Sequence, residues 1–99
     1  MPDPTIAPLS VRVPTDKSVR YMTQLAKHWS HKFEVQLTET TATVPLPFGL
    51  LTMQAQPDAI VGRFEPTPEA DLKRLKEVFE NHLNRFAFRE GELVYEWSA

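Results

Sequence analysis

Four short extended runs, joined by very short connections, constrain this chain more than any other feature. The runs are Phe33–Thr38, Ala42–Pro47, Leu50–Gln56 and Ala59–Glu65, and each connection between them has two or three residues. Apolar and polar side chains alternate in the first and third runs. Because a crossover between parallel strands needs about a dozen residues, these runs are predicted to pair as antiparallel hairpins. Pro45 and Pro47 cannot donate to a sheet ladder, which places the second run at an edge or at a bulge.

Two amphipathic helices flank the runs. The first is predicted to start with a cap at Thr15 or Asp16 and to reach about Lys32, with an apolar stripe of Val19, Met22, Leu25, Ala26 and Trp29. The second is predicted to start at Thr67-Pro68-Glu69, because threonine caps, proline suits the first turn and an acid meets the positive helix end. Its apolar stripe is Leu72, Leu75, Phe79, Leu83 and Phe86.

The remaining segments complete an α+β fold. Residues 9–14 alternate like a strand, and Leu93–Trp97 form a closing strand after Gly91, so the predicted order is β-α-β-β-β-β-α-β. Two amphipathic helices and one mostly antiparallel sheet favour a two-layer sandwich with both helices on one face. We expect residues 1–8 to be a flexible, proline-rich lead-in and residues 9–99 to form one domain.

Composition excludes several functional classes. The chain has no cysteine, which removes disulfides, thiolate metal sites and cysteine nucleophiles. The start has no charged and apolar leader, and no stretch approaches the ~18 apolar residues of a membrane span, so we expect a cytoplasmic protein without a membrane partner. A net charge of −2 and three scattered glycines give no basis for a nucleic-acid partner or a phosphate-binding loop.

The densest candidate site is the basic end of the first predicted helix. Residues 16–32 carry four bases against one acid, whereas residues 65–99 carry eight acids against five bases. Cations at a helix C-terminus stabilise the helix through its dipole, so a purely structural role is open. If the two helix ends lie together, they form an anion-binding surface. The ligand-binding candidates are Lys27, His28, His31, Lys32, His82, Arg85 and Arg89.

Histidine offers a second interpretation. His28 and His31 lie three residues apart in the predicted helix, and His82 could add a third ligand to an open metal site. No HExxH motif supports it, and no cofactor is predicted, with a metal ion as the alternative. His82 is also expected to be half-buried and hydrogen-bonded. Ser30 lacks a nucleophile motif, so no catalytic residue is assigned and a binding module is favoured over an enzyme.

Several blocks together resemble a small bacterial family. They are Tyr21, Gln24-Leu25, Lys27-His28-Trp29-Ser30-His31-Lys32, Pro47-Phe48-Gly49, His82-Leu83, Arg85-Phe86-Ala87-Phe88-Arg89-Glu90 and Trp97. The sequence is similar, over residues 9–98, to the family catalogued as domain of unknown function 2218. The resemblance implies a bacterial, cytoplasmic protein and supplies no activity. Some relatives accompany flavin-dependent siderophore-interacting reductases, which implies a link to iron acquisition by association.

Three functional hypotheses follow from the sequence. The first is a small non-enzymatic binding or accessory module for an anionic ligand or a partner protein, acting through the basic helix ends. The second is a histidine-based metal-binding protein or small metalloenzyme. The third is a homodimer that uses the sheet face or edge left uncovered by the helices.

Overall fold

The computed structural model describes residues 8–68, 70–87 and 93–98 of the chain. The elements in order are β1 (Leu9–Pro14), α1 (Ser18–Trp29), β2 (Gln36–Leu37), β3 (Thr41–Leu46), β4 (Gly49–Gln56), β5 (Ala59–Pro66), α2 (Leu72–Phe86) and β6 (Glu96–Ser98). This order confirms the predicted α+β arrangement. The predicted lead-in lies, apart from Pro8, outside the described residues. Neither described helix is long and apolar enough to cross a membrane.

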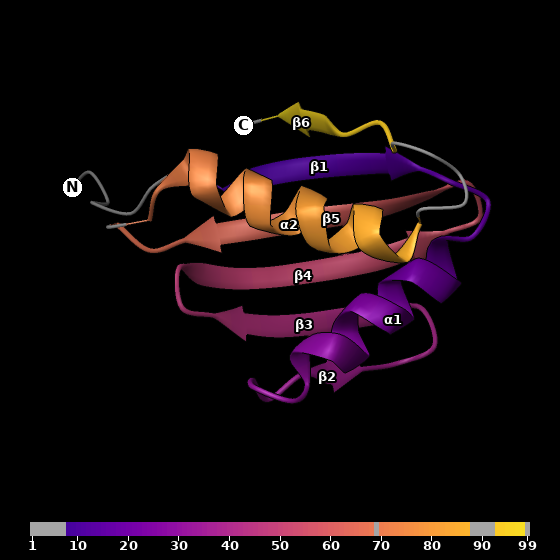
Figure 1. The fold of residues 1–99 in the computed structure, drawn as a ribbon, viewed down its shortest axis with the longest axis horizontal. Coiled ribbons are helices and arrows are strands. Elements are labelled where there is room, and N and C mark those ends of the chain that lie inside the picture. The colour runs from indigo at the N-terminus through magenta and orange to yellow at the C-terminus, as the bar shows by residue number, and fades with distance from the viewer. Residues whose placement is uncertain (1–7, 69, 88–92, 99) are drawn as a thin grey trace.

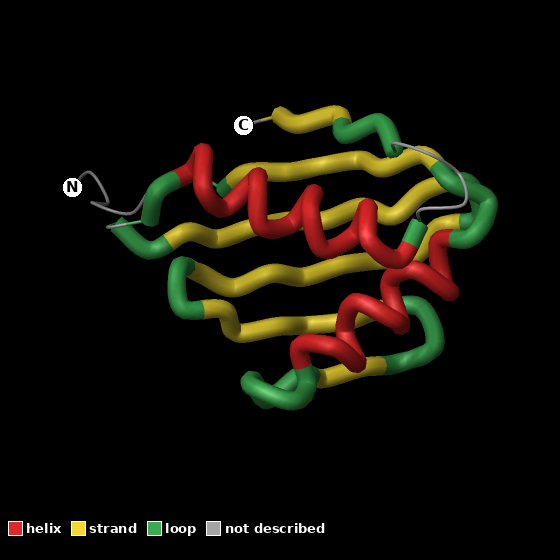
Figure 2. Tube along the Cα trace, in the orientation of Figure 1, coloured by secondary structure: helices red, strands yellow, loops and turns green. Residues whose placement is uncertain are grey.

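The strands form one antiparallel sheet in the order β2-β3-β4-β5-β1-β6. Figure 1 shows both helices crossing the same face of this sheet, and Figure 2 shows the same two layers. The β3–β4 and β4–β5 connections are tight hairpins, as their length requires. β1 then pairs with β5 and β6, which brings the start of the domain to an inner position next to the edge strand β6.

Pairing register places the core on the helix-covered face. Alternate residues of each long strand are buried there: Leu9, Val11 and Val13 in β1, Ala42, Val44 and Leu46 in β3, Leu51 and Met53 in β4, and Ile60 and Phe64 in β5. Gly62 belongs to the same row, opposite Val11. A Cβ at Gly62 would lie 3.0 Å from Val11 Cγ1, so the missing side chain makes room for Val11, and 3.9 Å from Phe79, whose ring packs over this position.

The strand that carries the prolines is not at the outer edge, because β2 lies beyond it. β2 spans only two residues, however, and pairs with Ala42 and Thr43. Pro45 therefore lies where β3 has no outer neighbour, so a missing N–H costs no ladder bond there. The predicted six-residue strand over 33–38 was too long, since Phe33 and Val35 pack against the core from the preceding loop.

The first helix differs from its prediction at both ends. It ends at Trp29 rather than near Lys32, and neither predicted cap stands at the position before Ser18. Thr15 instead accepts the Lys17 N–H at 3.1 Å, in the turn that precedes the helix. The predicted stripe was also wrong at Val19, which is 43% exposed. The true stripe repeats every three or four residues through Ser18, Tyr21, Met22, Leu25, Ala26 and Trp29.

The second helix begins later than the Thr-Pro-Glu sequence predicts. Asp71 is its cap and accepts the Arg74 N–H at 3.2 Å. Thr67 lies before the helix: its N–H donates to the Phe48 carbonyl at 2.9 Å, which ties the end of β5 to the β3–β4 turn, and its carbonyl accepts the Ala70 N–H at 3.0 Å in a single turn. The local start signal therefore marks a turn, and the helix itself begins after Asp71.

Aromatic side chains join α2 to β6. Phe79 is 1% exposed, and its ring lies 5.7 Å from Phe64, 6.1 Å from Tyr95 and 5.7 Å from Trp97, between ring centroids. Trp97 donates its indole N–H to Glu80 Oε2 at 2.7 Å. β6 covers Glu96–Ser98, so the predicted strand over 93–97 began too early; Tyr95 lies before it.

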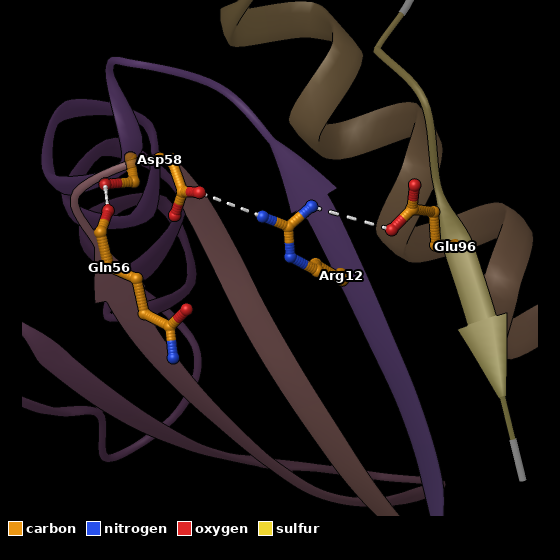
Figure 3. Close-up of polar contacts among 5 residues, drawn as sticks. Arg12, Gln56, Asp58 and Glu96 are labelled. Carbon is orange, nitrogen blue, oxygen red and sulfur yellow. Dashed lines mark hydrogen bonds and ion pairs between the residues drawn. The ribbon is translucent and has the colours of Figure 1, made fainter.

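The uncovered face of the sheet carries a small polar network, shown in Figure 3. Arg12 lies 3.1 Å from Asp58 and 3.6 Å from Glu96, and so links β1 to the β4–β5 turn and to β6. At the same end, Ser18 donates to the Gln56 carbonyl and fixes the start of α1. The charged side chains are 42–74% exposed, so each pair contributes at most about 1 kcal/mol, far less than the core.

Gly49 is predicted to be intolerant of substitution. Its φ is +150°, and an added Cβ would lie 2.6 Å from the Glu65 carbonyl oxygen and 2.8 Å from Pro66 Cα. Backbone cannot move aside as a flexible side chain can, so Gly49→Ala is expected to lower the free energy of unfolding by about 2 kcal/mol. Urea unfolding measures this loss. Thr52→Ala, an exposed change in the same strand, is the control, and equal stability of both variants would contradict the expectation.

Candidate functional site

The two helices diverge toward the β3–β4 turn (Figure 1). A cleft lies in this region, lined by residues of both helices and of that turn. Its volume is about 580 Å³, within the range of roughly 300–1,000 Å³ typical of small-molecule sites. Three segments far apart in the sequence build it: the end of α1 with the turn that follows, the β3–β4 turn, and one face of α2. The lining residues are His28, Trp29, His31, Lys32, Phe33, Leu46, Pro47, Phe48, Arg74, Val78 and His82.

Burial divides this lining into an apolar interior and a cationic rim. Trp29 and Leu46 are 5% and 8% exposed, and Phe33, Phe48 and Val78 are half-buried. The exposed lining residues include His31, Lys32 and Arg74. An apolar group is therefore favoured inside the cleft, and a negative charge is favoured at its mouth.

The two helices touch through a group of rings beside the cleft. The His82 ring lies 5.4 Å from both the His28 ring and the Trp29 ring, between centroids, and the His28 ring lies 6.0 Å from Phe86. Two titratable imidazoles from different helices thus share one wall. Sequence alone could not show this contact, since 54 residues separate the two positions.

A backbone hydrogen bond fixes the tautomer of His82. Its Nδ1 lies 2.7 Å from the Val78 carbonyl oxygen, one helical turn earlier. A carbonyl only accepts, so Nδ1 carries the proton and donates, which leaves the Nε2 lone pair available in the neutral ring. This is the half-buried, hydrogen-bonded arrangement that the sequence indicated for His82. In that tautomer Nε2 is the acceptor atom of the ring.

His28 is held in its neutral form more strongly than a free histidine. Partial burial of the ring lowers its pKa from the usual 6.5, and the positive charges of His82, Arg85, His31 and Lys32 lower it further. All four charged neighbours named here repel a proton on His28. An anion bound beside His28 would offset that repulsion and raise its pKa again, so anion binding is coupled to proton uptake.

We expect the lowered pKa of His28 to appear in the pH dependence of the stability of the protein. The folded state binds fewer protons at His28 than the unfolded state, so stability is full above pH 6.5 and falls as the pH drops from 6.5 through the lower folded pKa. The melting temperature measured against pH reports the stability, and the His28 ring proton shifts followed by NMR report its pKa in the folded state. His28→Gln should reduce the fall in melting temperature below pH 6.5, and a His28 titration midpoint above 6.5 would contradict the account.

The structure brings together some predicted site residues and not others. His28, His31, Lys32 and His82 line the cleft, although His31 lies in the turn beyond α1 and not on the helix as predicted. Arg85 is exposed and near enough to lower the pKa of His28, but it lies outside the lining, as does Lys27. The prediction for Arg89 falls outside the described residues.

The metal interpretation gains no cluster from the structure. Within residues 8–68, 70–87 and 93–98, no group of three histidine, aspartate or glutamate side chains is placed to hold a metal ion. Ser30, considered as a nucleophile, donates its hydroxyl to the Lys27 carbonyl at 2.6 Å.

Sequence reasoning identified His82 but missed Arg74 and Val78 of α2 and the residues of the β3–β4 turn. Arg74, Val78 and His82 are spaced by four residues, which places them on one face of a helix. That spacing was readable, but only the placement of both helices on the sheet shows that this face and Lys32 line one cleft. Phe48 was not among the predicted site residues.

Comparisons with known proteins place the chain in a bacterial family. No curated protein matches it. The chain is similar to a solved structure, the NMR structure of PA4090 from Pseudomonas aeruginosa, with 30% sequence identity, a TM-score of 0.75, and coverage of 94% of this chain and 96% of that chain. The family model described as "Uncharacterized protein conserved in bacteria (DUF2218)" matches residues 10–98. The chain therefore belongs to this bacterial family.

Proposed function

We propose that the protein binds a small organic anion in the cleft between α1 and α2, as a binding or accessory module without catalytic activity. One observation carries the proposal. Five lining residues are cations or can become cations, His28, His31, Lys32, Arg74 and His82, and no carboxylate occurs among the described lining residues. The whole chain has 13 acids and 11 bases, so the lining of the cleft is enriched in cationic groups compared with the chain as a whole.

The physical setting strengthens each charge. Arg74 presents a planar guanidinium from α2, and Lys32 presents an ammonium from the turn after α1. Because the apolar walls exclude water from one side, hydrogen bonds to a bound anion are stronger here than on an open surface. His82 lines the same cleft, with its Nδ1 hydrogen-bonded to the Val78 carbonyl oxygen.

A binding role fits the site better than catalysis. In the described contacts, the Nδ1 of His82 faces a backbone carbonyl and not a carboxylate, and Ser30 is bonded to a carbonyl of its own helix. The pairing of a nucleophile, a base and an orienting acid that activates hydrolytic sites is not assembled around these groups.

An NMR titration of the isotope-labelled protein tests the proposal. Compact anions (phosphate, citrate) and aromatic carboxylates are added separately at constant pH and ionic strength, with zinc chloride as the test of the metal alternative. We expect saturable shifts of the His28, Lys32, Phe33 and His82 signals with at least one anion. Shifts confined to the uncovered sheet face, or absent with every anion, would contradict the proposal.

Narrower proposals concern the identity of the ligand, the cellular location and the assembly of the protein, and each has its own test. An iron-loaded anionic siderophore is one candidate within the ligand class, suggested by the neighbours of related proteins, and it is tested in the same titration.

Cell fractionation tests the cytoplasmic location. Light scattering tests the homodimer, and capture of a partner through the helix face tests an accessory role; a clean monomer at high concentration would remove the dimer.

A further inference from the structure

We infer that the cleft selects a flat aromatic carboxylate, in which a ring system enters between the helices and a single carboxylate stays at the mouth. This inference rests on the proposed anion-binding function and narrows it to one chemical class. It follows from three properties of the cleft: how exposed its apolar and charged side chains are, which kind of apolar side chains they are, and where the cations lie.

The exposure of the lining favours a ligand with two unlike ends. Phe33, Phe48 and Val78 are half-buried, whereas Lys32 and Arg74 are exposed. A compact ion such as phosphate could pair with the rim but would leave the apolar surface of the half-buried side chains in contact with water. A neutral apolar molecule could fill the interior but would leave the rim cations without a partner. A ligand that carries both an apolar body and one charge satisfies both.

The lining favours an aromatic body over an aliphatic one. Five of the eleven lining side chains carry rings with π-systems: His28, Trp29, Phe33, Phe48 and His82. Aromatic rings attract one another by offset-stacked and edge-to-face contacts, in addition to the burial of area. A saturated body of the same size gains only the burial.

The cations come from two walls of the cleft. Lys32 and His31 follow α1, and Arg74 projects from the first turn of α2. A carboxylate at the mouth can therefore receive donors from both sides while its ring points inward. The repulsion that lowers the pKa of His28 in the free protein is relieved by the same charge, so binding is expected to strengthen as the pH falls toward 6.

A matched series of four probes tests the inference by calorimetry and by NMR on the whole chain. They are 2-naphthoate, decahydro-2-naphthoate (the same carboxylate on a saturated, non-planar body), 2-naphthalenemethanol (the same ring without the charge) and inorganic phosphate. We expect 2-naphthoate to bind at the cleft about tenfold or more tightly than each of the other three.

The other outcomes separate this inference from the proposed function. If phosphate or the saturated carboxylate binds at the cleft as tightly as 2-naphthoate, the aromatic class is wrong and the anion-binding function stands. If the neutral alcohol binds as tightly as 2-naphthoate, the charge contributes nothing and both are wrong. Both are also wrong if no probe shifts the signals of residues that line the cleft.

Discussion

Phe79→Ala is expected to destabilise the protein by about 4 kcal/mol, the largest effect of any single change considered. The Phe79 ring is 1% exposed and packs against Phe64, Tyr95 and Trp97, above the bare backbone of Gly62. Removing it leaves a cavity that these neighbours cannot fill, because the sheet below and β6 beside it are fixed by backbone pairing. A domain of this size is stable by only about 5–15 kcal/mol, so the variant should be close to unfolding at 37 °C.

Urea unfolding with an unchanged m-value measures this loss. Val19→Ala is the control, because Val19 is an apolar helix residue that is 43% exposed, and a change within about 0.5 kcal/mol is expected there. A loss below about 1 kcal/mol for Phe79→Ala would mean that the ring cluster between α2 and β6 does not hold the fold together.

The double variant Lys32→Ala/Arg74→Ala is expected to weaken binding of 2-naphthoate by roughly 100-fold. Each cation supplies a charge-assisted hydrogen bond from a different wall of the cleft. Such bonds contribute about 1.5–3 kcal/mol, and both side chains are exposed, so the lower end of about 1.5 kcal/mol applies to each. Stability should change little, since neither side chain lies in the core.

The matched control is Lys27→Ala/Arg63→Ala. It removes the same two residue types and the same net charge, but Lys27 is an exposed residue of α1 and Arg63 an exposed residue of β5, and both lie outside the cleft lining. We expect a change of less than about threefold, the part due to overall charge. Arg85→Ala is a third variant, expected to alter the pH dependence of binding through His28 more than the affinity itself. Equal losses in the two double variants would show that only bulk charge matters.

The fold was predictable because its determinants are local. Alternation with a period of two, connections of two or three residues and two amphipathic stripes leave few arrangements other than an antiparallel sheet with helices on one face. The errors occurred where long-range contacts decide. Thr67 has the sequence of a helix cap, but its N–H donates to the Phe48 carbonyl in a turn, and the helix begins only after Asp71.

The site was only partly predictable for the same reason. His28, His31, Lys32 and His82 could be named, since basic and imidazole groups are recognisable without a structure. The apolar half of the cleft could not, because Leu46 and Phe48 resemble ordinary core and turn residues until the β3–β4 turn is placed beside the end of α1. This contact depends on the order of the strands in the sheet, which the periodicity of the sequence does not reveal.

The most direct test of the central claim follows the two indole N–H signals in a titration with 2-naphthoate. Trp29 lines the cleft, whereas Trp97 donates to Glu80 outside the lining, so each molecule carries its own control. We predict a saturable shift of the Trp29 indole signal with the Trp97 signal unmoved, and loss of that shift in the Lys32→Ala/Arg74→Ala variant. Equal movement of both indole signals, or no movement of the Trp29 signal at saturating ligand, would contradict the assignment of the cleft as an anion-binding site.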